Sequence, residues 1–171
     1  MLIGAAAEVP QGANDGISHI IWNVLLCDKT APLSAAELAA NKVHHILAIL
    51  PNADALPATV RDSGLPVTVL AYGDQHEPTL SAAQRADFAA AGALIDAEAQ
   101  KAEGRGSVLV FCNSGYQRSI PFLAYYLTTR HPTEAPSIAR AVDLILPQVD
   151  REGYSASRDR WIAAVEQVLH E

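Results

Sequence analysis

The sequence predicts an α/β fold, with a mostly parallel central sheet of four to five strands flanked by helices. Two observations indicate this. Short apolar runs alternate with longer segments of helical periodicity, and the last third of the chain is helical. The run 108–111 is apolar throughout, which is typical of an inner strand with both faces buried. At 171 residues we expect one domain, 1–171, in which residues 1–16 form a loose lead-in.

The elements are expected in a definite order. Strands are predicted within 17–27, where one or two fit, and at 43–50, 65–72 and 108–111. Helices are predicted at 34–42, 81–103, 119 to about 130, 135–146 and 155–170, with a helical turn at 58–62. Two helix starts carry a capping-box pattern, Ser34 to Glu37 and Ser81 to Gln84.

Charge and composition exclude several classes of function. The formal net charge of −7 argues against nucleic acid or an anionic membrane surface as the partner. Half of the residues are hydrophobic, so a packed globule is expected rather than disorder. No apolar run reaches the length of a membrane span, and the N-terminus lacks a signal pattern. Two cysteines do not make a disulfide framework. The oligomeric state stays open.

His44 and His45 stand together at the start of the strand expected at 43–50. Neighbouring strand side chains point to opposite faces, so the two imidazoles cannot bind one metal ion as a simple pair. No other His, Cys or carboxylate spacing makes a zinc pattern. We therefore expect one surface and one core histidine, and no metal site. Trp22 is interpreted as a core residue.

The chain is organised around the stretch 108–119. Its apolar strand ends at Cys112, a loop containing Gly115 follows, and a helix begins after Arg118. Backbone N–H groups at such a helix N-terminus bind an anion of phosphate size. Arg118 can hold two phosphate oxygens, and the same positive field favours the nucleophilic thiolate of Cys112. Ser119 can hydrogen-bond the sulfur and ease its later departure.

This stretch resembles the active-site loop of the cysteine-dependent protein tyrosine phosphatases, whose signature is His-Cys, five residues, Arg, then Ser or Thr. It looks most like the small, atypical dual-specificity phosphatases, because Gly115-Tyr116-Gln117-Arg118-Ser119 matches their Gly-Tyr-x-Arg-Ser. One departure is Phe111, which stands where the family has the His that helps to hold the loop and to activate the cysteine. The order of elements from Ile17 to His170 is also similar to that family's catalytic domain. The resemblance implies a phosphate-binding loop made of Asn113, Ser114, Gly115, Tyr116, Gln117 and Arg118.

A thiolate that attacks a phosphate ester needs an acid to protonate the leaving oxygen. Asp74 is the candidate, because it follows a buried strand and so belongs to the carboxyl edge of the sheet. The resemblance implies the same role, since the family's general acid is an Asp on such a loop before a long helix. His76 and Glu77 are alternatives, and a merely solvated Asp74 stays open. No cofactor is expected, because Arg118 and the loop amides neutralise the phosphate charge.

The expected reaction is hydrolysis of a phosphomonoester through a phosphocysteine intermediate. The chain has no obvious extra segment for a deep phosphotyrosine pocket, so proteins carrying phosphoserine, phosphothreonine or phosphotyrosine are the expected substrates, with a small phosphomonoester as the alternative. The variable loop residues include no Lys or Arg, which disfavours phosphoinositides and RNA 5′ ends. A catalytic thiol also requires a reducing compartment, so a cytoplasmic location is expected.

Two other classes of protein compete with this interpretation. A phosphatase-like module that binds phosphorylated partners without efficient turnover is favoured by Phe111. The presence of Cys112, Arg118 and Ser119, together with a well-placed Asp74, disfavours it. Sulfurtransferases usually have a shorter Cys-to-Arg spacing. Arsenate reductases need further thiols close to the first one, and only Cys27 is available.

Overall fold

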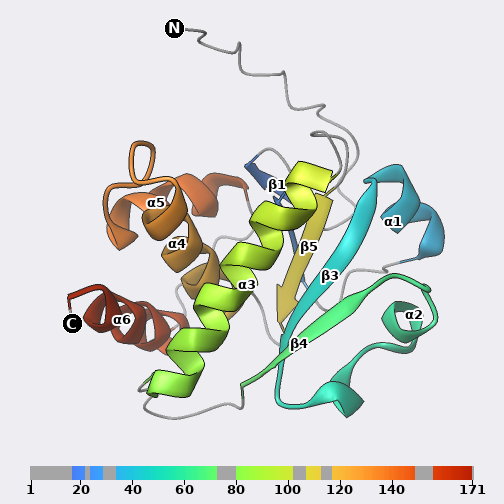
Figure 1. The fold of residues 1–171 in the computed structure, drawn as a ribbon, viewed down its shortest axis with the longest axis horizontal. Coiled ribbons are helices and arrows are strands. Elements are labelled where there is room, and N and C mark those ends of the chain that lie inside the picture. The colour runs from blue at the N-terminus through green and yellow to red at the C-terminus, as the bar shows by residue number, and fades with distance from the viewer. Residues whose placement is uncertain are drawn as a thin grey trace, which may run out of the picture.

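The central feature of the protein is a five-stranded sheet (Figure 1), seen in a computed structural model that describes residues 17–21, 24–28, 34–72, 80–101, 107–112, 117–148 and 156–170. Across the sheet the strands are β1 (Ile17–Ile21), β2 (Val24–Asp28), β5 (Ser107–Cys112), β3 (Val43–Leu50) and β4 (Val67–Ala71). β1 is antiparallel to β2, and the other four strands run parallel. The predicted fold class is therefore confirmed, with β5 in the middle of the sheet.

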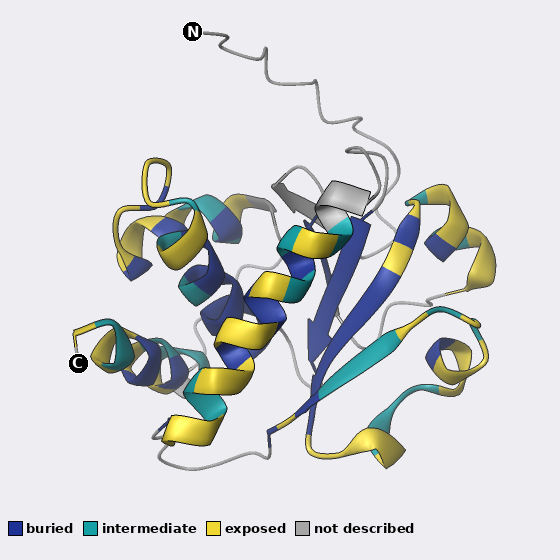
Figure 2. Cartoon of the chain, viewed as in Figure 1, coloured by how far each residue is buried: buried dark blue, intermediate teal, exposed yellow. Residues whose placement is uncertain are grey.

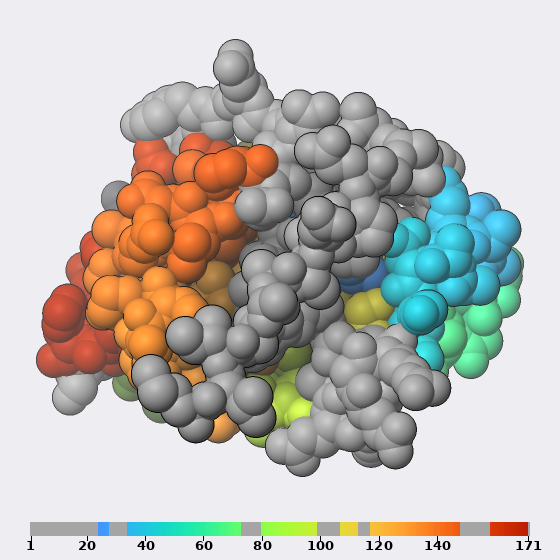
Figure 3. Space-filling view, turned by 90° about the horizontal axis from the view of Figure 1, so that it is seen from above, coloured from blue at the N-terminus to red at the C-terminus, as the bar shows by residue number. Residues whose placement is uncertain are grey.

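Helices cover both faces of the sheet (Figure 1). One face carries α1 (Ala35–Ala40) and α2 (Ala58–Arg61), and a 3₁₀ turn at Ala53–Ala55 precedes α2. The other face carries α3 (Ala82–Lys101), α4 (Ser119–Arg130), α5 (Ile138–Ile145) and α6 (Ala156–His170), with a 3₁₀ turn at Leu146–Gln148. Seen from above, α1 lies on the opposite side of the molecule from α5 and α6 (Figure 3).

Both predicted capping boxes are present. At α1, Ser34 Oγ accepts a hydrogen bond from the Glu37 N–H at 3.2 Å, and Glu37 Oε2 accepts one from the Ser34 N–H at 2.6 Å. At α3, Ser81 Oγ accepts from the Gln84 N–H at 3.3 Å, and Gln84 Oε1 accepts from the Ser81 N–H at 2.9 Å. Each pair satisfies N–H groups that have no partner inside the helix.

Several boundaries differ from the predictions by one to three residues, and two of these differences have a clear local cause. The helix predicted from residue 135 begins at Ile138, because Ser137 caps it by accepting the Arg140 N–H at 3.2 Å, and residues 131–135 form a turn. β4 is shorter than the predicted strand at 65–72, since Pro66 has no N–H to contribute to a ladder. Trp22, predicted to be a core residue, lies outside the described residues.

The buried residues form two clusters, one on each face of the sheet (Figure 2). All six residues of β5 are buried, and the side chains from Val108 to Cys112 alternate between the two clusters. The Phe111 face consists of Leu25, Cys27, Leu38, Val43, Ile46, Ala48, Leu50, Val60, Leu109 and Phe111. The larger Cys112 face includes Phe88, Val108, Val110, Cys112, Phe122, Leu123 and Trp161.

The adjacent histidines on β3 are separated as predicted. His44 is exposed, whereas His45 is buried, with Nε2 2.9 Å from Thr68 Oγ1 and Nδ1 3.7 Å from Glu98 Oε1. Nowhere in the described ranges do three His, Cys, Asp or Glu side chains gather closely enough to hold a metal ion. In the same ranges, every helix is too short or too polar to cross a membrane.

Candidate active site

Cys112 is the last residue of β5, at the carboxyl edge of the parallel strands. In the sheet register it lies beside Asp28 of β2 and Ile49 of β3. Its side chain is 1% exposed and belongs to the Cys112 face. Ligands of parallel α/β sheets bind at the carboxyl ends of the strands, so the proposed nucleophile lies where the fold can support chemistry.

The start of α4 returns to the end of β5. Ser119 is the first residue of α4 and is fully buried, and its Oγ lies 3.4 Å from Cys112 Sγ. This contact closes a loop between two residues seven apart in the chain. A hydroxyl that donates to sulfur favours the charged thiolate over the neutral thiol. The geometry therefore fits the role predicted for Ser119.

Arg118 is the N-cap residue of α4, and only 2% of it is exposed. Its carbonyl accepts the Phe122 N–H at 3.1 Å, which begins the helical hydrogen-bond pattern. Pro121 is buried in the first turn, where its missing N–H removes no intrahelical bond. A guanidinium held inside the protein at a helix N-terminus is suited to an anion such as phosphate.

The structure brings Cys112 and Ser119 together, with Arg118 next to Ser119 at the helix start. Gln117 is half-buried and directly precedes Arg118. The other predicted site residues lie outside the described residues: Asn113, Ser114, Gly115, Tyr116 and Asp74, together with the alternative acids His76 and Glu77. Their roles stay predictions.

Phe111 lies on the opposite face of the sheet from Cys112. Its side chain is fully buried among apolar residues, including Leu25 and Leu38. A histidine at this position would leave the strand in the same direction, because side-chain direction follows the strand alternation. The phenyl ring therefore packs against the apolar cluster on the side of the strand away from the Cys112 thiol.

Cys27 also lies on the Phe111 face. It is buried, and it is beside Phe111 in the register between β2 and β5. The sheet separates its thiol from that of Cys112, and neither cysteine forms a disulfide. A mechanism in which a second thiol attacks Cys112, as in the arsenate reductase alternative, has no support from this arrangement.

A cluster that the sequence did not reveal holds the two ends of the segment 73–79, which carries Asp74. Before the segment, the hydroxyl of Tyr72 donates to the carbonyl of Gln84 at 3.0 Å. After it, Leu80 is buried and Ser81 caps α3. The sequence shows that a tyrosine follows the predicted strand. It does not show that Gln84 of α3 accepts its hydrogen bond, because that contact depends on tertiary packing.

Comparison with known proteins supports the fold. No family model matches the sequence, and no curated protein matches it. Among solved structures, human DUSP28 superposes with a TM-score of 0.67 at 17% identity, covering 97% of this chain and 100% of that one. Human tyrosine phosphatase-like serine/threonine/tyrosine-interacting protein gives 0.67 at 18% identity, covering 91% and 98%. PTPMT1 in complex with PI(5)P gives 0.62 at 16%, covering 91% and 98%. The chain thus has the fold of these small dual-specificity phosphatases.

Proposed function

We propose that this protein is a cysteine-dependent phosphatase that hydrolyses phosphomonoesters, with phosphotyrosine, phosphoserine and phosphothreonine of proteins as substrates. The observation that carries the proposal is the 3.4 Å contact between Cys112 Sγ and Ser119 Oγ at the junction of β5 and α4, with buried Arg118 beside it. The shared fold supports it. PTPMT1 was solved in complex with PI(5)P, which carries a phosphomonoester. This supports a phosphomonoester as the group on which the protein acts.

In the first step, the Cys112 thiolate attacks phosphorus and the bond to the ester oxygen breaks. Arg118 and the N–H groups of the loop hold the other phosphate oxygens, where negative charge accumulates. Asp74 protonates the leaving oxygen, so the alcohol or phenol departs neutral. The product of this step is a phosphocysteine.

In the second step, water attacks the phosphocysteine. Asp74, now ionised, accepts a proton from the water, and the sulfur leaves as a thiolate. Ser119 stabilises that thiolate by donating its hydroxyl proton to Sγ, for which the 3.4 Å separation is suitable. Inorganic phosphate is released and the starting state returns. In this scheme the positive charge comes from Arg118 and backbone dipoles.

The experiment that tests the proposal is hydrolysis of para-nitrophenyl phosphate across pH, without added metal, by the wild type and by Cys112→Ser. We expect turnover by the wild type and none by the variant, which should still bind vanadate or phosphate. Turnover near the wild-type rate in Cys112→Ser would contradict the assignment of the nucleophile. Phosphopeptides and PI(5)P assayed under the same conditions then separate protein from lipid substrates.

Asp74 is tested by the dependence of the rate on the leaving group. Asp74→Asn should slow esters with poor leaving groups by about 10²-fold or more, because these need protonation. Activated aryl phosphates should lose much less. An equal loss on both kinds of ester would exclude Asp74 as the acid and turn attention to His76 and Glu77.

A phosphatase-like binding module is the second candidate, and Phe111 in place of the family's His favours it. Anion binding without turnover in the wild type would support this function. In that case Phe111 is the first residue to replace. Cys112, Arg118 and Ser119 all match the family's signature, and Phe111 departs from it.

A further inference from the structure

A hydroxyl, an imidazole and a carboxylate contact one another in that order on the Cys112 face of the sheet. His45 Nε2 lies 2.9 Å from Thr68 Oγ1, and His45 Nδ1 lies 3.7 Å from Glu98 Oε1. The three residues belong to β3, β4 and α3, so only the folded chain brings them together. We call Thr68, His45 and Glu98 the relay. No step of the proposed phosphatase reaction uses it.

The relay is separate from the proposed active site. His45 is beside Val108 in the register between β3 and β5, and Cys112 ends β5 four residues later. At about 3.3 Å per residue, His45 and Cys112 are about 13 Å apart along the sheet. The relay therefore lies near the amino-terminal ends of the strands, whereas Cys112 lies at their carboxyl ends.

The relay is partly exposed. Thr68 is half-buried, and it belongs to β4, the strand at one edge of the described sheet. The side chain of His45 is 11% exposed and that of Glu98 is 19% exposed. Partial burial restricts the rotamers of the imidazole and the carboxylate, while Thr68 keeps some contact with solvent.

The order of the three groups determines what they can do chemically. A carboxylate near Nδ1 favours the tautomer of His45 with its proton on Nδ1, so that Nε2 accepts a hydrogen bond from the Thr68 hydroxyl. An imidazole in this place is a general base for the hydroxyl, and the carboxylate stabilises the imidazolium that forms. The 3.7 Å separation from Glu98 is within ion-pair range, and such contacts are often long in the free protein and tighten in the reacting complex.

β4 also supplies a backbone donor next to Thr68. The Tyr72 N–H donates to the Leu50 carbonyl at 2.7 Å, and β3 and β4 are parallel. In this register the N–H groups of residues 68, 70 and 72 point to β3, so the N–H of Val69 points away from it. A donor in this place can stabilise the oxyanion that forms when a neighbouring hydroxyl attacks a carbonyl carbon.

We propose that Thr68 is a nucleophile that accepts an acyl group, with His45 as its general base and Glu98 as the positioning residue for His45. The acyl donor is a small activated ester or thioester. Thr68 Oγ1 bonds to the acyl carbon and gives its proton to His45 Nε2, and the bond from that carbon to the leaving oxygen or sulfur breaks. His45 then gives the proton to the leaving group. The products are acylated Thr68 and an alcohol or thiol.

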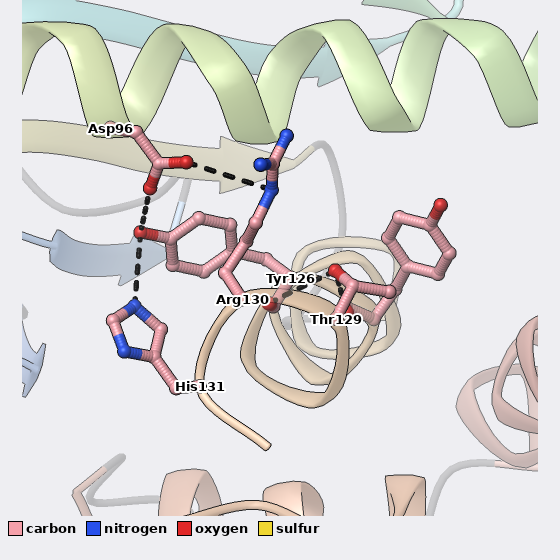
Figure 4. A network of polar contacts seen from close by, with 6 residues as sticks. Asp96, Tyr126, Thr129, Arg130 and His131 are labelled. Atoms are coloured by element: carbon pink, nitrogen blue, oxygen red, sulfur yellow. Dashed lines mark hydrogen bonds and ion pairs between the residues drawn. The ribbon is translucent and has the colours of Figure 1, made fainter. Parts of the chain in front are cut away.

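A second network on α3 and α4 has the same kinds of group in a different order (Figure 4). The Tyr126 hydroxyl donates to Asp96 Oδ1 at 2.9 Å, and His131 Nε2 lies 3.3 Å from the same hydroxyl oxygen. The hydroxyl proton is thus directed to the carboxylate rather than to the imidazole. Burial, helped by the hydrogen bond to Asp96, raises the pKa of Tyr126. This network is a matched control, because its hydroxyl has no base that is oriented for its proton.

The test is labelling of the full chain with para-nitrophenyl acetate at neutral pH, with the acetylated residues mapped by mass spectrometry. Thr68 should be acetylated at least about tenfold faster than Thr129, because only Thr68 contacts a general base. Thr129 is exposed, and its hydroxyl donates to the Tyr125 carbonyl at 2.8 Å. Tyr126 should remain unlabelled. Mapping separates these sites from acetylated lysines and cysteines.

Variants then test the role of each residue. His45→Gln should slow acetylation of Thr68 by about 10²-fold, within the range that a general base contributes. Glu98→Gln keeps the size of the side chain and should slow it by a smaller factor. His131→Gln, the matched change in the second network, should leave the rate at Thr68 unchanged. Thr68→Val should remove the label and keep hydrolysis of para-nitrophenyl phosphate at the wild-type rate.

Three results would overturn the proposal. The first is acetylation of Thr68 no faster than that of Thr129. The second is an unchanged rate at Thr68 in Glu98→Gln, which remains informative if His45→Gln does not fold. The third is an equal loss in His131→Gln, because it would indicate a general effect on packing. None of these results depends on the phosphatase assay, so the relay and the proposed function can fail separately.

Discussion

Phe111 and Cys112 are neighbours at the end of β5, and both are buried, yet they belong to opposite faces of the sheet. The Cys112 face lies under four helices, including the two longest, α3 of 20 residues and α6 of 15. The Phe111 face lies under α1 and α2, which have six and four residues. The same strand end thus places the proposed nucleophile on one face and a large buried aromatic side chain on the other.

Each face of the sheet carries a cysteine and a capping box, so the two faces can be compared feature by feature. Each has one cysteine, Cys112 or Cys27, and both thiols are buried. Among the residues that the structure describes, each face has one capping box, closed by Gln84 at α3 and by Glu37 at α1. The two thiols therefore differ in their place in the fold, and of these two capping boxes only the one at α1 contains an ionisable residue. Each pair gives a direct experimental comparison.

The largest expected difference is between the two thiols. Cys112→Ala should lower kcat for para-nitrophenyl phosphate by about 10³-fold or more, because the covalent intermediate cannot form. Cys27→Ala should keep kcat within about twofold and lower the free energy of unfolding by about 1 kcal/mol, the cost of a small cavity. Steady-state kinetics and urea unfolding of both variants measure these effects. A similar loss of activity in the two variants would mean that the faces are not functionally distinct.

The next effect is on stability, at Phe111. Phe111→Ala should lower the free energy of unfolding by about 3–5 kcal/mol, because a large side chain is removed from a fully buried site. Val67→Ala is a control on the same face, where the side chain is only partly buried, and it should cost clearly less. Urea denaturation followed by fluorescence gives both values. Equal costs would show that Phe111 is not the anchor of its face.

Phe111→His tests whether the family's histidine can be restored. The imidazole would enter an apolar cluster, so we expect the free energy of unfolding to fall by about 1–3 kcal/mol. If the histidine activates the neighbouring cysteine, Cys112 should be alkylated faster at mildly acidic pH than in the wild type. Phe111→Leu is the control for packing. An unchanged alkylation rate in a folded Phe111→His would show that the substitution is neutral for the thiol.

The smallest effect concerns the two capping boxes. Ser34 holds the pKa of Glu37 below its ordinary value of 4.5. The larger effect comes from a hydrogen bond with its side chain, and the smaller one from its backbone N–H. Because the pKa of Glu37 is lower in the folded protein than in the unfolded chain, its ionised carboxylate stabilises the fold at pH values above the unfolded pKa. This stabilisation is lost as the pH falls through the folded pKa. Amide hydrogen exchange at Leu38 should therefore quicken in acid relative to its intrinsic rate, whereas Arg85, at the equivalent position of α3, should not change. Glu37→Gln should abolish the difference.

Local signals determined most of the secondary structure. The capping patterns at Ser34 and Ser81 placed two helix starts correctly, and the apolar run at 43–50 matches β3. These features depend on hydrogen bonds and periodicity within a few residues, which a sequence displays directly. The helix predicted from 135 begins at Ile138, because Ser137 caps it. The apolar pattern alone did not indicate this N-cap.

The sequence by itself determined the α/β class, the strand that ends at Cys112 and the helix start that carries Arg118 and Ser119, because all of these lie within one short stretch. Only the tertiary structure decided the strand order, the separation of Cys27 from Cys112 and the bond between Tyr72 and Gln84. These depend on which strands pair, in what register, and on how α3 packs against the sheet. Such contacts join residues that carry no signal of one another in the chain.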